Sequence, residues 1–237
     1  MAIGIIGAMD EEIDYFQEYI EKSVKVEKGH QTFYKGNWNG EETVLVKSGV
    51  GKVNAAMAAQ KMIDLFDVTK IIFTGVAGAA NPSLNVGDIL ISVSCQQHDI
   101  DASPLGFKKG TIPMFNGPSD FKADPVLVDT AYNSAQKTAG QQKVLKGKVV
   151  SGDQFIADKE KIRELRELFN ADCVEMEGAA VAQAACFNNI PYVVIRSISD
   201  KANGEANRSF QDFMKTAADN SAKIVADMMK SIKNEEN

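Results

Sequence analysis

The sequence predicts an α/β protein in three α/β/α layers, with a central mixed, twisted β-sheet between two layers of helices. Short runs of apolar, β-branched residues alternate along the chain with stretches whose apolar residues recur at helical spacing. No linker, repeat or low-complexity segment interrupts this alternation. Of the 237 residues, 44% are apolar and 24% are charged, which is ordinary for a protein with a sizeable core. We therefore expect residues 1–237 to form a single domain.

Charge and cysteine usage argue against several classes of function. The formal net charge is −6 and there is no basic block, so we expect no binding of nucleic acid, which needs clustered lysine and arginine. No apolar run approaches the length of a membrane span, and the N-terminal apolar run is too short for a signal peptide. The three cysteines form no CxxC pair, which predicts reduced thiols and a cytoplasmic location.

The first part of the chain predicts strands and two helices. Residues 3–6 predict a buried strand, and the residues after it an amphipathic helix. Glu11 and Glu12 fall in the first turn of that helix, where the helix dipole favours negative charge. The alternative is that one of them points from the strand end into a site. Residues 24–47 predict strands joined by hairpins, and residues 53–66 a helix.

The rest of the chain continues the alternation. Residues 71–74 predict a strand that ends in a glycine turn at 75–78, where backbone amides can approach a ligand closely. Residues 97–121 predict a long loop, and loops of that length are usually functional or interfacial. The remaining expected elements are strands at 86–93, 144–150, 173–176 and 192–195, and helices at 125–139, 158–169, 178–187 and 209–232.

Polar side chains follow the apolar strand at 192–195. Arg196, Ser199 and Asp200 are residues for which a core strand has no use. In open α/β sheets the ligand lies outside the carboxyl ends of the strands, so Asp200 stands where a reacting group is expected. The alternative is that Asp200 caps the turn before residues 203–204.

A second pair of carboxylates marks another strand end. Glu175 and Glu177 flank Met176 between a buried strand and an alanine-rich helix, where an unpartnered carboxylate is expensive. One of them could instead cap the helix that follows. Together with Glu12 and Asp200 they suit cleavage of a glycosidic bond, with one carboxyl group as general acid and another activating water.

The sequence indicates no cofactor and no metal. Neither a dinucleotide fingerprint nor a phosphate-binding loop of the GxxxxGK[ST] type is present. His98 beside Asp99 and Asp101 is a weak metal signal, because one histidine and two aspartates in a loop seldom form a metal site.

Five motifs in register resemble the bacterial 5′-methylthioadenosine/S-adenosylhomocysteine nucleosidases of the nucleoside phosphorylase/hydrolase superfamily. They are Gly-Ile-Ile-Gly-Ala-Met-Asp-Glu-Glu12, Lys-Ser-Gly-Val-Gly-Lys52, Val-Ser-Gly-Asp-Gln-Phe-Ile156, Val-Glu-Met-Glu177 and Ile-Ser-Asp200, and the likeness runs from Ile3 to about Ile232. The resemblance implies a nucleoside phosphorylase-like fold, one nucleosidase domain over residues 1–237, a homodimer and no cofactor. The implied reaction is hydrolysis of the N-glycosidic bond of methylthioadenosine, adenosylhomocysteine and also 5′-deoxyadenosine, in methionine salvage and the methyl cycle.

The resemblance also implies roles for single residues. Asp200 would protonate N7 of adenine, Glu12 would hold and deprotonate the attacking water, and Glu177 would bind the ribose hydroxyls. The expected substrate-binding set is Met9, Val50, Met176 and Phe210 along the ribose and 5′-thio group, Phe155 and Ile156 at adenine, Arg196 and Ser199 behind Asp200, and Gly78 and Glu175. Leu105 and Pro113 resemble positions that close the pocket of the neighbouring subunit.

Two positions depart from the family pattern. Val76 stands where a small polar residue is expected, which puts a side-chain hydrogen bond in doubt. Leu105 stands where an aromatic residue is common, which can loosen the wall of the 5′-pocket.

Two other functions stay open at the level of sequence. A purine nucleoside phosphorylase would use phosphate in place of water, but no arginine precedes Arg163 and Glu12 would repel a phosphate dianion. A non-catalytic nucleoside-binding protein could keep Phe155 and Glu177, but it would have no need of Glu12 together with Asp200.

Overall fold

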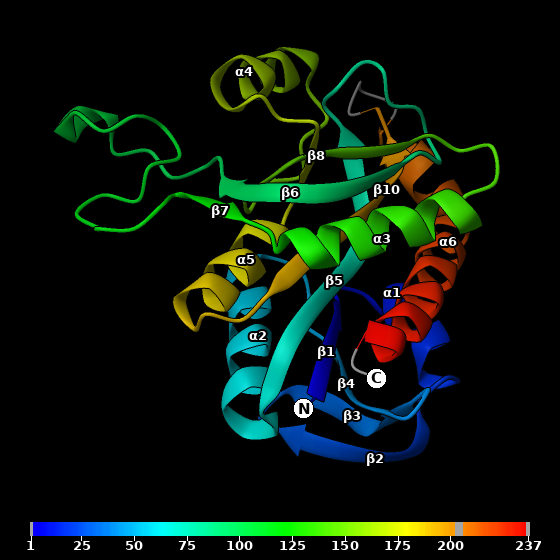
Figure 1. Cartoon of the computed structure of the whole chain (residues 1–237). Helices are drawn as coiled ribbons and strands as arrows, with labels where there is room; N and C mark the ends of the chain where they lie inside the picture. The colour runs from blue at the N-terminus through cyan, green and yellow to red at the C-terminus, as the bar shows by residue number, and fades with distance from the viewer. Residues whose placement is uncertain (1, 202–205, 236–237) are drawn as a thin grey trace.

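The computed structural model describes residues 2–201 and 206–235, although the side chains of 206–212, 214–215 and 233–235 lie outside the described part (Figure 1). The strands are β1 Ala2–Gly7, β2 Glu21–Lys28, β3 Gln31–Trp38, β4 Glu41–Lys47, β5 Val68–Ala79, β6 Ile89–Gln97, β7 Asp120–Lys122, β8 Val144–Ser151, β9 Cys173–Glu175 and β10 Tyr192–Asp200. The helices are α1 Asp10–Gln17, α2 Lys52–Phe66, α3 Pro125–Thr138, α4 Lys159–Phe169, α5 Gly178–Phe187 and α6 Ala206–Glu235, with a 3₁₀ turn, η1, at Ser103–Leu105.

The strands form one mixed sheet that partly closes on itself. Its order is β10-β6-β8-β9-β5-β1-β4-β3-β2, and β7 pairs with β6. Because β10 also pairs with β5, the strands β5, β10, β6, β8 and β9 make a closed ring. The pairs β1–β4, β1–β5 and β5–β10 are parallel, whereas β5–β9 and β6–β10 are antiparallel. The prediction of an α/β fold with a mixed sheet is confirmed.

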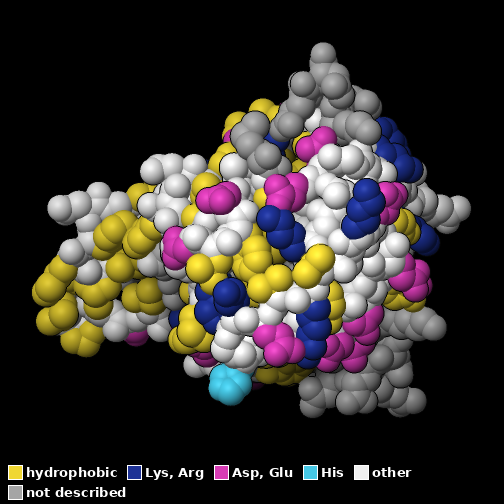
Figure 2. Space-filling view, turned by 90° about the horizontal axis from the view of Figure 1, so that it is seen from below, with side chains coloured by type: hydrophobic (Ala, Val, Ile, Leu, Met, Phe, Trp, Pro, Cys, Tyr) yellow, Lys and Arg dark blue, Asp and Glu magenta, His cyan; other side chains and the backbone are white. Residues whose placement is uncertain are grey.

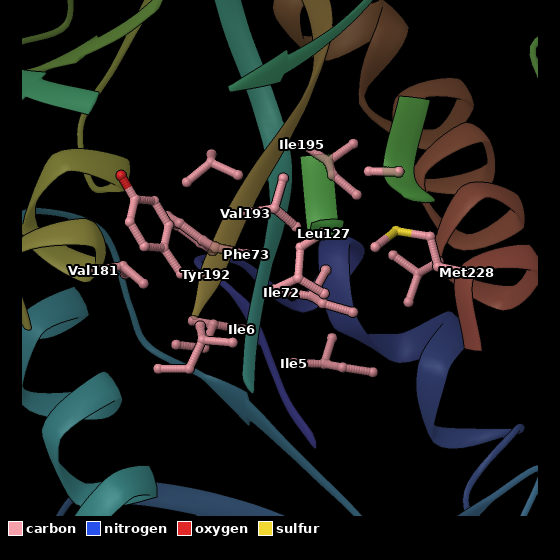
Figure 3. Packing of buried hydrophobic residues seen from close by; sticks show 14 of the residues in the cluster. Ile5, Ile6, Ile72, Phe73, Leu127, Val181, Tyr192, Val193, Ile195 and Met228 are labelled. Atoms are coloured by element: carbon pink, nitrogen blue, oxygen red, sulfur yellow. The ribbon is translucent and has the colours of Figure 1, made fainter. Parts of the chain in front are cut away.

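Helices cover the sheet on two sides and bury alternate residues of its strands. In Figure 1, α2 and α5 lie on one side, and α1, α3 and α6 lie on the other. Figure 3 shows Ile6 and Phe73 pointing toward the side on which α2 and α5 lie, and their neighbours Ile5 and Ile72 pointing toward the side of α6. All four side chains are fully buried. Successive residues of a strand point to opposite faces, so strands that are apolar on both faces need a helical layer on each side.

The prediction of a glycine turn at 75–78 is wrong, because these residues continue strand β5 to Ala79. Glycine is a weak strand former, but here two neighbouring strands supply partners. Residues 75–78 pair with β10, and Gly78 also lies opposite Val174 of β9. Tertiary pairing therefore overrides the local preference.

Other boundaries also differ from expectation for the same reason. Strand β10 continues past residue 195 to Asp200 because β5 accompanies it, and β6 spans Ile89–Gln97 rather than 86–93. The long loop contains η1 and ends in β7, and its residues 98–119, called the arm below, project to the left of the sheet in Figure 1. None of the helices in the described ranges is both long enough and apolar enough to cross a membrane.

Candidate active site

A cavity of about 280 Å³ lies where β1, β5, β9 and β10 end. Of the predicted site residues, those that line it are Met9, Glu12, Val50, Gly78, Phe155, Ile156, Glu175, Met176, Glu177, Ser199 and Asp200. The sequence analysis did not single out Ala8, Ala77, Gln154 and Val174, which also line it. Ala8, Gln154 and Val174 stand inside the motifs quoted above, which was the available signal for them, whereas only the fold reveals Ala77.

Glu12 is held at the start of α1 by backbone amides. The amide N–H groups of Ala8 and Met9 donate to its Oε2 at 2.6 and 3.1 Å, and that of Val76 donates to Oε1 at 3.2 Å. Burial raises the pKa of Glu12, although the charge of Arg196 and the three amides oppose that rise. A fixed carboxylate with a raised pKa is a stronger base than an exposed one, which suits it to act as a general base.

This geometry resolves two points that the sequence left open. Glu12 is buried and lines the cavity, whereas Glu11 is exposed to solvent. Glu12 also accepts from the amide of Met9, which precedes the helix, so it stabilises the helix end as well. Val76 contributes a hydrogen bond through its backbone, which needs no polar side chain.

The guanidinium of Arg196 faces three buried carboxylates. Its Nη2 lies 2.5 Å from Glu175, and the charges of Glu12, Glu175 and Glu177 all act on it. Its guanidinium carbon also lies 4.0 Å from the centre of the Phe73 ring. Three ionised carboxylates around one cation would leave two buried negative charges in excess, which is costly. This excess opposes ionisation of Glu177, because, besides burial, the charges of Glu175 and Glu12 both raise its pKa.

Gly75 makes room for this cluster. A Cβ atom at position 75 would lie 2.5 Å from Nη1 of Arg196 and 2.5 Å from Oε1 of Glu12. Any other residue would push these two side chains apart. The sequence analysis missed this role because it placed Gly75 in a turn, where glycine has a different purpose.

Glu175 is occupied by protein groups. It accepts hydrogen bonds from Arg196, from the hydroxyl of Ser151, and from the amides of Glu177 and Gly178 at 3.2 and 2.7 Å. The amide bonds cap the start of α5, which is the alternative that the sequence left open for one of the two carboxylates. Glu175 lies at the cavity, and its oxygens hold the surrounding structure together.

Glu177 has a different environment although it is two residues away. Its Oε1 accepts from the amide of Gly51 at 2.7 Å. Burial and the charge of Glu175 raise its pKa to about 8, against the opposing effects of Arg196 and the Gly51 hydrogen bond. Glu177 therefore holds a proton near neutral pH in the structure without ligand.

Asp200 lies at the end of β10, opposite Gly78, and is 3% exposed. The hydroxyl oxygen of Ser199 lies 2.8 Å from its Oδ2 and 3.3 Å from the carbonyl oxygen of Ala77. The hydroxyl can donate to an ionised Asp200. When Asp200 is protonated, it can donate to Ser199 while Ser199 donates to Ala77. The pair accommodates both protonation states, as a proton donor requires.

The rim of the cavity is more open than its inner wall. Val50 is 48% exposed and Phe155 is 50% exposed, and both line the cavity. An aromatic face at the rim suits stacking against a planar base. The rim is therefore the wall at which a planar ligand can enter and stack.

Some predicted residues lie elsewhere. Leu105 and Pro113 are on the arm and do not line the cavity of their own chain. Arg196 lies behind the cavity, against Glu175. The side chain of Phe210 lies outside the described residues.

Within the described residues, no group of three histidine, cysteine or acidic side chains is placed to hold a metal ion. The carboxylates of the weak metal signal have protein partners. Asp99 accepts from Lys52 at 2.6 Å, and Asp101 accepts from the hydroxyl of Ser103 at 2.6 Å.

Comparison with known proteins identifies the family. Residues 2–230 match the model of the phosphorylase superfamily. A curated 5′-methylthioadenosine/S-adenosylhomocysteine nucleosidase of Staphylococcus carnosus is 42% identical over 97% of this chain and 100% of its own length. The chain belongs to this nucleosidase family of the phosphorylase superfamily.

Solved structures agree with that assignment. The family's nucleosidase from Neisseria meningitidis, in complex with methylthio-immucillin-A, is 39% identical, with a TM-score of 0.92 over 97% of this chain and 99% of that one. A futalosine hydrolase of Helicobacter pylori is 35% identical, with a TM-score of 0.92 over 98% of both chains. The nucleoside phosphorylase-like fold that the resemblance implied is confirmed.

Proposed function

We propose that this chain, acting as one domain over residues 1–237, hydrolyses the N-glycosidic bond of 5′-methylthioadenosine and S-adenosylhomocysteine. 5′-Deoxyadenosine is a further proposed substrate. The observation that carries the proposal is that Glu12, Glu177 and Asp200 line one cavity that is mostly apolar. The products would be adenine and the free thioribose, and the family membership supports this substrate class.

In the proposed mechanism, the bond between C1′ and N9 breaks and its electron pair moves to adenine. Asp200 gives its proton to N7, which prevents build-up of negative charge on the leaving base. The water oxygen attacks C1′, and its proton passes to Glu12. Both groups act more strongly on the transition state than on the substrate, because charge develops only as the bond breaks.

The binding roles follow from position in the cavity. Glu177 would hold the ribose hydroxyls, Phe155 would stack on adenine, and the backbone of Ile156 would meet the edge of the base. Met9 and Met176 would contact the ribose and the 5′-thio group. Adenine would thus lie between Phe155 at the rim and Asp200 at the inner wall, and the ribose would lie beside Glu177.

Hydrolysis is favoured over phosphorolysis by the state of Arg196. This arginine is 1% exposed, is paired with Glu175 and does not line the cavity, so it is not available to bind phosphate. A phosphate dianion at the water position would also meet the carboxyl group of Glu12. Water is the better fit as the nucleophile.

We also propose a homodimer in which Leu105 and Pro113 of one subunit close the 5′-end of the neighbour's cavity. Leu105 is 66% exposed and Met114 is 87% exposed, and Figure 2 shows many hydrophobic side chains on the lobe at the left, where the arm projects in Figure 1. Exposed apolar surface of this kind is typical of an interface. Light scattering should then give twice the chain mass of 25.7 kDa.

The deciding experiment is an adenine-release assay on methylthioadenosine, adenosylhomocysteine and 5′-deoxyadenosine, with and without phosphate. Release of adenine and free sugar without phosphate supports the proposal. Strict dependence on phosphate, with a sugar 1-phosphate as product, would establish a phosphorylase instead. Futalosine belongs in the panel of substrates, because a structural neighbour is named futalosine hydrolase.

The cytoplasmic location expected from the cysteines stays a prediction.

A further inference from the structure

Three residues outside the cavity form a closed set of hydrogen bonds. The Nζ of Lys52 donates to Oδ1 of Asp99 at 2.6 Å, and the amide of Lys52 donates to Oδ1 of Asp153 at 2.8 Å. The amide of Asp153 donates to Oδ2 of Asp99 at 3.0 Å. We call Lys52, Asp99 and Asp153 the clamp. It ties together the start of α2, the base of the arm, and the loop that carries Phe155.

The Lys52–Asp99 pair of the clamp is more buried than an ordinary surface ion pair of this protein, whereas Asp153 is exposed. The side chains of Lys52 and Asp99 are 16% and 17% exposed, whereas those of the pair Lys25–Glu27 are 58% and 68% exposed. Burial opposes ionisation of Asp99, but hydrogen bonds from Lys52 and from the Asp153 amide outweigh it and lower its pKa. A partly buried, charge-assisted pair of this kind is worth more than an exposed pair.

The clamp is adjacent in sequence to two groups that line the cavity or bind there. Gly51 precedes Lys52, and its amide donates to Glu177 at 2.7 Å. Phe155 follows Asp153 by two residues and lines the cavity. Lys52 and Asp153 themselves do not line it.

The chain around the clamp has little freedom. Gly51 has φ of +98°, which glycine adopts readily, and a Cβ there would lie 3.2 Å from the carboxylate of Asp153. A Cβ at Gly152 would lie 2.4 Å from Nε2 of His98, so the end of β6 packs directly against the 151–156 loop. The amide of His98 also donates to the carbonyl oxygen of Ser151 at 2.9 Å.

We propose that the clamp is a positioning set that holds the adenine side of the cavity, on the 151–156 loop, in register with the ribose side, at Gly51 and Glu177. Its loss lets the two sides move apart, and one bound nucleoside then cannot satisfy both. Glu12 and Asp200 are carried by other elements, α1 and β10, so the bond-breaking step is little affected. The clamp therefore sets KM more than kcat. This inference rests on the proposed function.

Asp99→Asn is the main test. Asparagine has one oxygen acceptor where aspartate has two, so either the Asp153 amide loses its partner or Lys52 keeps only its hydrogen bond to Gln97, and the negative charge is lost in both cases. We expect KM for methylthioadenosine and the dissociation constant of adenine to rise about 10-fold, and kcat to change less than about 3-fold. The free energy of one charge-assisted hydrogen bond corresponds to roughly one factor of ten in an equilibrium constant. Steady-state kinetics and calorimetry with adenine measure these quantities.

Glu164→Gln is the matched control. It removes the charge of Glu164, which pairs with Lys109 of the same arm at 3.0 Å and with Lys161 of its own helix at 2.9 Å but does not touch the 151–156 loop. KM should stay within about 2-fold of the original value, because an exposed pair contributes little. An equal rise of KM in this control would show that any loosening of the arm suffices, and would overturn the role of the clamp.

Lys52→Met and the double variant Lys52→Met/Asp99→Asn test whether the residues act as a unit. We expect the double variant to raise KM no more than the larger single change, since coupled partners are not additive. Additive effects, an unchanged KM in Asp99→Asn, or a fall of kcat equal to that of kcat/KM would each contradict the proposal. The adenine dissociation constant is measured by binding alone, so it tests the clamp even if the original chain hydrolyses none of the nucleosides.

Discussion

The inner wall and the rim of the cavity are built by different means. The inner wall comes mainly from strand ends whose positions are fixed by backbone pairing, such as Asp200 with Gly78, and the pair Arg196 with Gly75 supports it from behind. The rim comes from loops that carry Val50 and Phe155, each about half exposed, and side-chain hydrogen bonds of the clamp hold them. In the proposed mechanism, the groups that transfer protons lie on the part of the cavity with the less exposed side chains, which suits their need for exact placement.

The comparison predicts which kinetic constant each region controls. Changes in the inner wall should lower kcat, because they displace or remove a group that acts on the transition state. Changes at the rim should raise KM, because they weaken contacts that substrate and transition state share. An inner-wall variant that only raised KM, or a rim variant that only lowered kcat, would contradict this division.

The largest effect is expected for Asp200→Asn at the inner wall. An amide cannot supply the acidic proton, so kcat should fall by about 10² to 10⁴. Binding of adenine, measured by calorimetry, should change little. Full turnover by this variant would contradict the assignment of Asp200 as the acid, and it would reopen the question of a different proton source.

Gly75→Ala should come next. The added methyl group meets Arg196 and Glu12 at 2.5 Å, and a displacement of about 1 Å can lower kcat about 10²-fold. Gly4→Ala is the matched control, because a Cβ at Gly4 also meets side-chain atoms, at 2.9 Å from Val68, but in β1 away from the cavity. Both variants should lower the melting temperature, by a few degrees for an overpacking cost of about 1–3 kcal/mol. Only Gly75→Ala should lower kcat strongly.

Phe155→Ala tests the rim. Loss of one base–aromatic stacking contact costs about 1–3 kcal/mol, so KM should rise about 10-fold or more while kcat changes little. The measurement is steady-state kinetics with methylthioadenosine. A fall of kcat without a rise of KM would show that Phe155 acts on the transition state, as the inner-wall residues are expected to do.

The smallest effect concerns the stability of the chain without ligand. Glu177 keeps its proton to about pH 8 when folded, against an ordinary pKa of 4.5. Between these values the folded state binds more protons, so the free energy of unfolding decreases as pH rises. Glu12, whose pKa is also raised, acts in the same direction. Glu177→Gln should make the melting temperature fall less between pH 5 and pH 8. A decline as steep as that of the original chain would show that Glu177 does not titrate in this range.

Sequence reasoning proposed Asp200 as a reacting group because of its context. A carboxylate at the end of a buried strand has few structural reasons to be there. The same reasoning could not separate Glu175 from Glu177, because both flank Met176 in the same motif. Only the partners tell them apart: Glu175 is occupied by Arg196 and Ser151, whereas Glu177 meets Gly51.

The sequence by itself determined the α/β alternation, the strands that carry functional groups, and the family, because periodicity and local motifs are properties of neighbouring residues. Only the tertiary structure decided that β5 and β10 continue through residues expected in turns, since their pairing partners are distant in the chain. It also decided the role of Gly75, which depends on two side chains from other elements. The contacts of the clamp join positions 52, 99 and 153, and no local pattern could have revealed them.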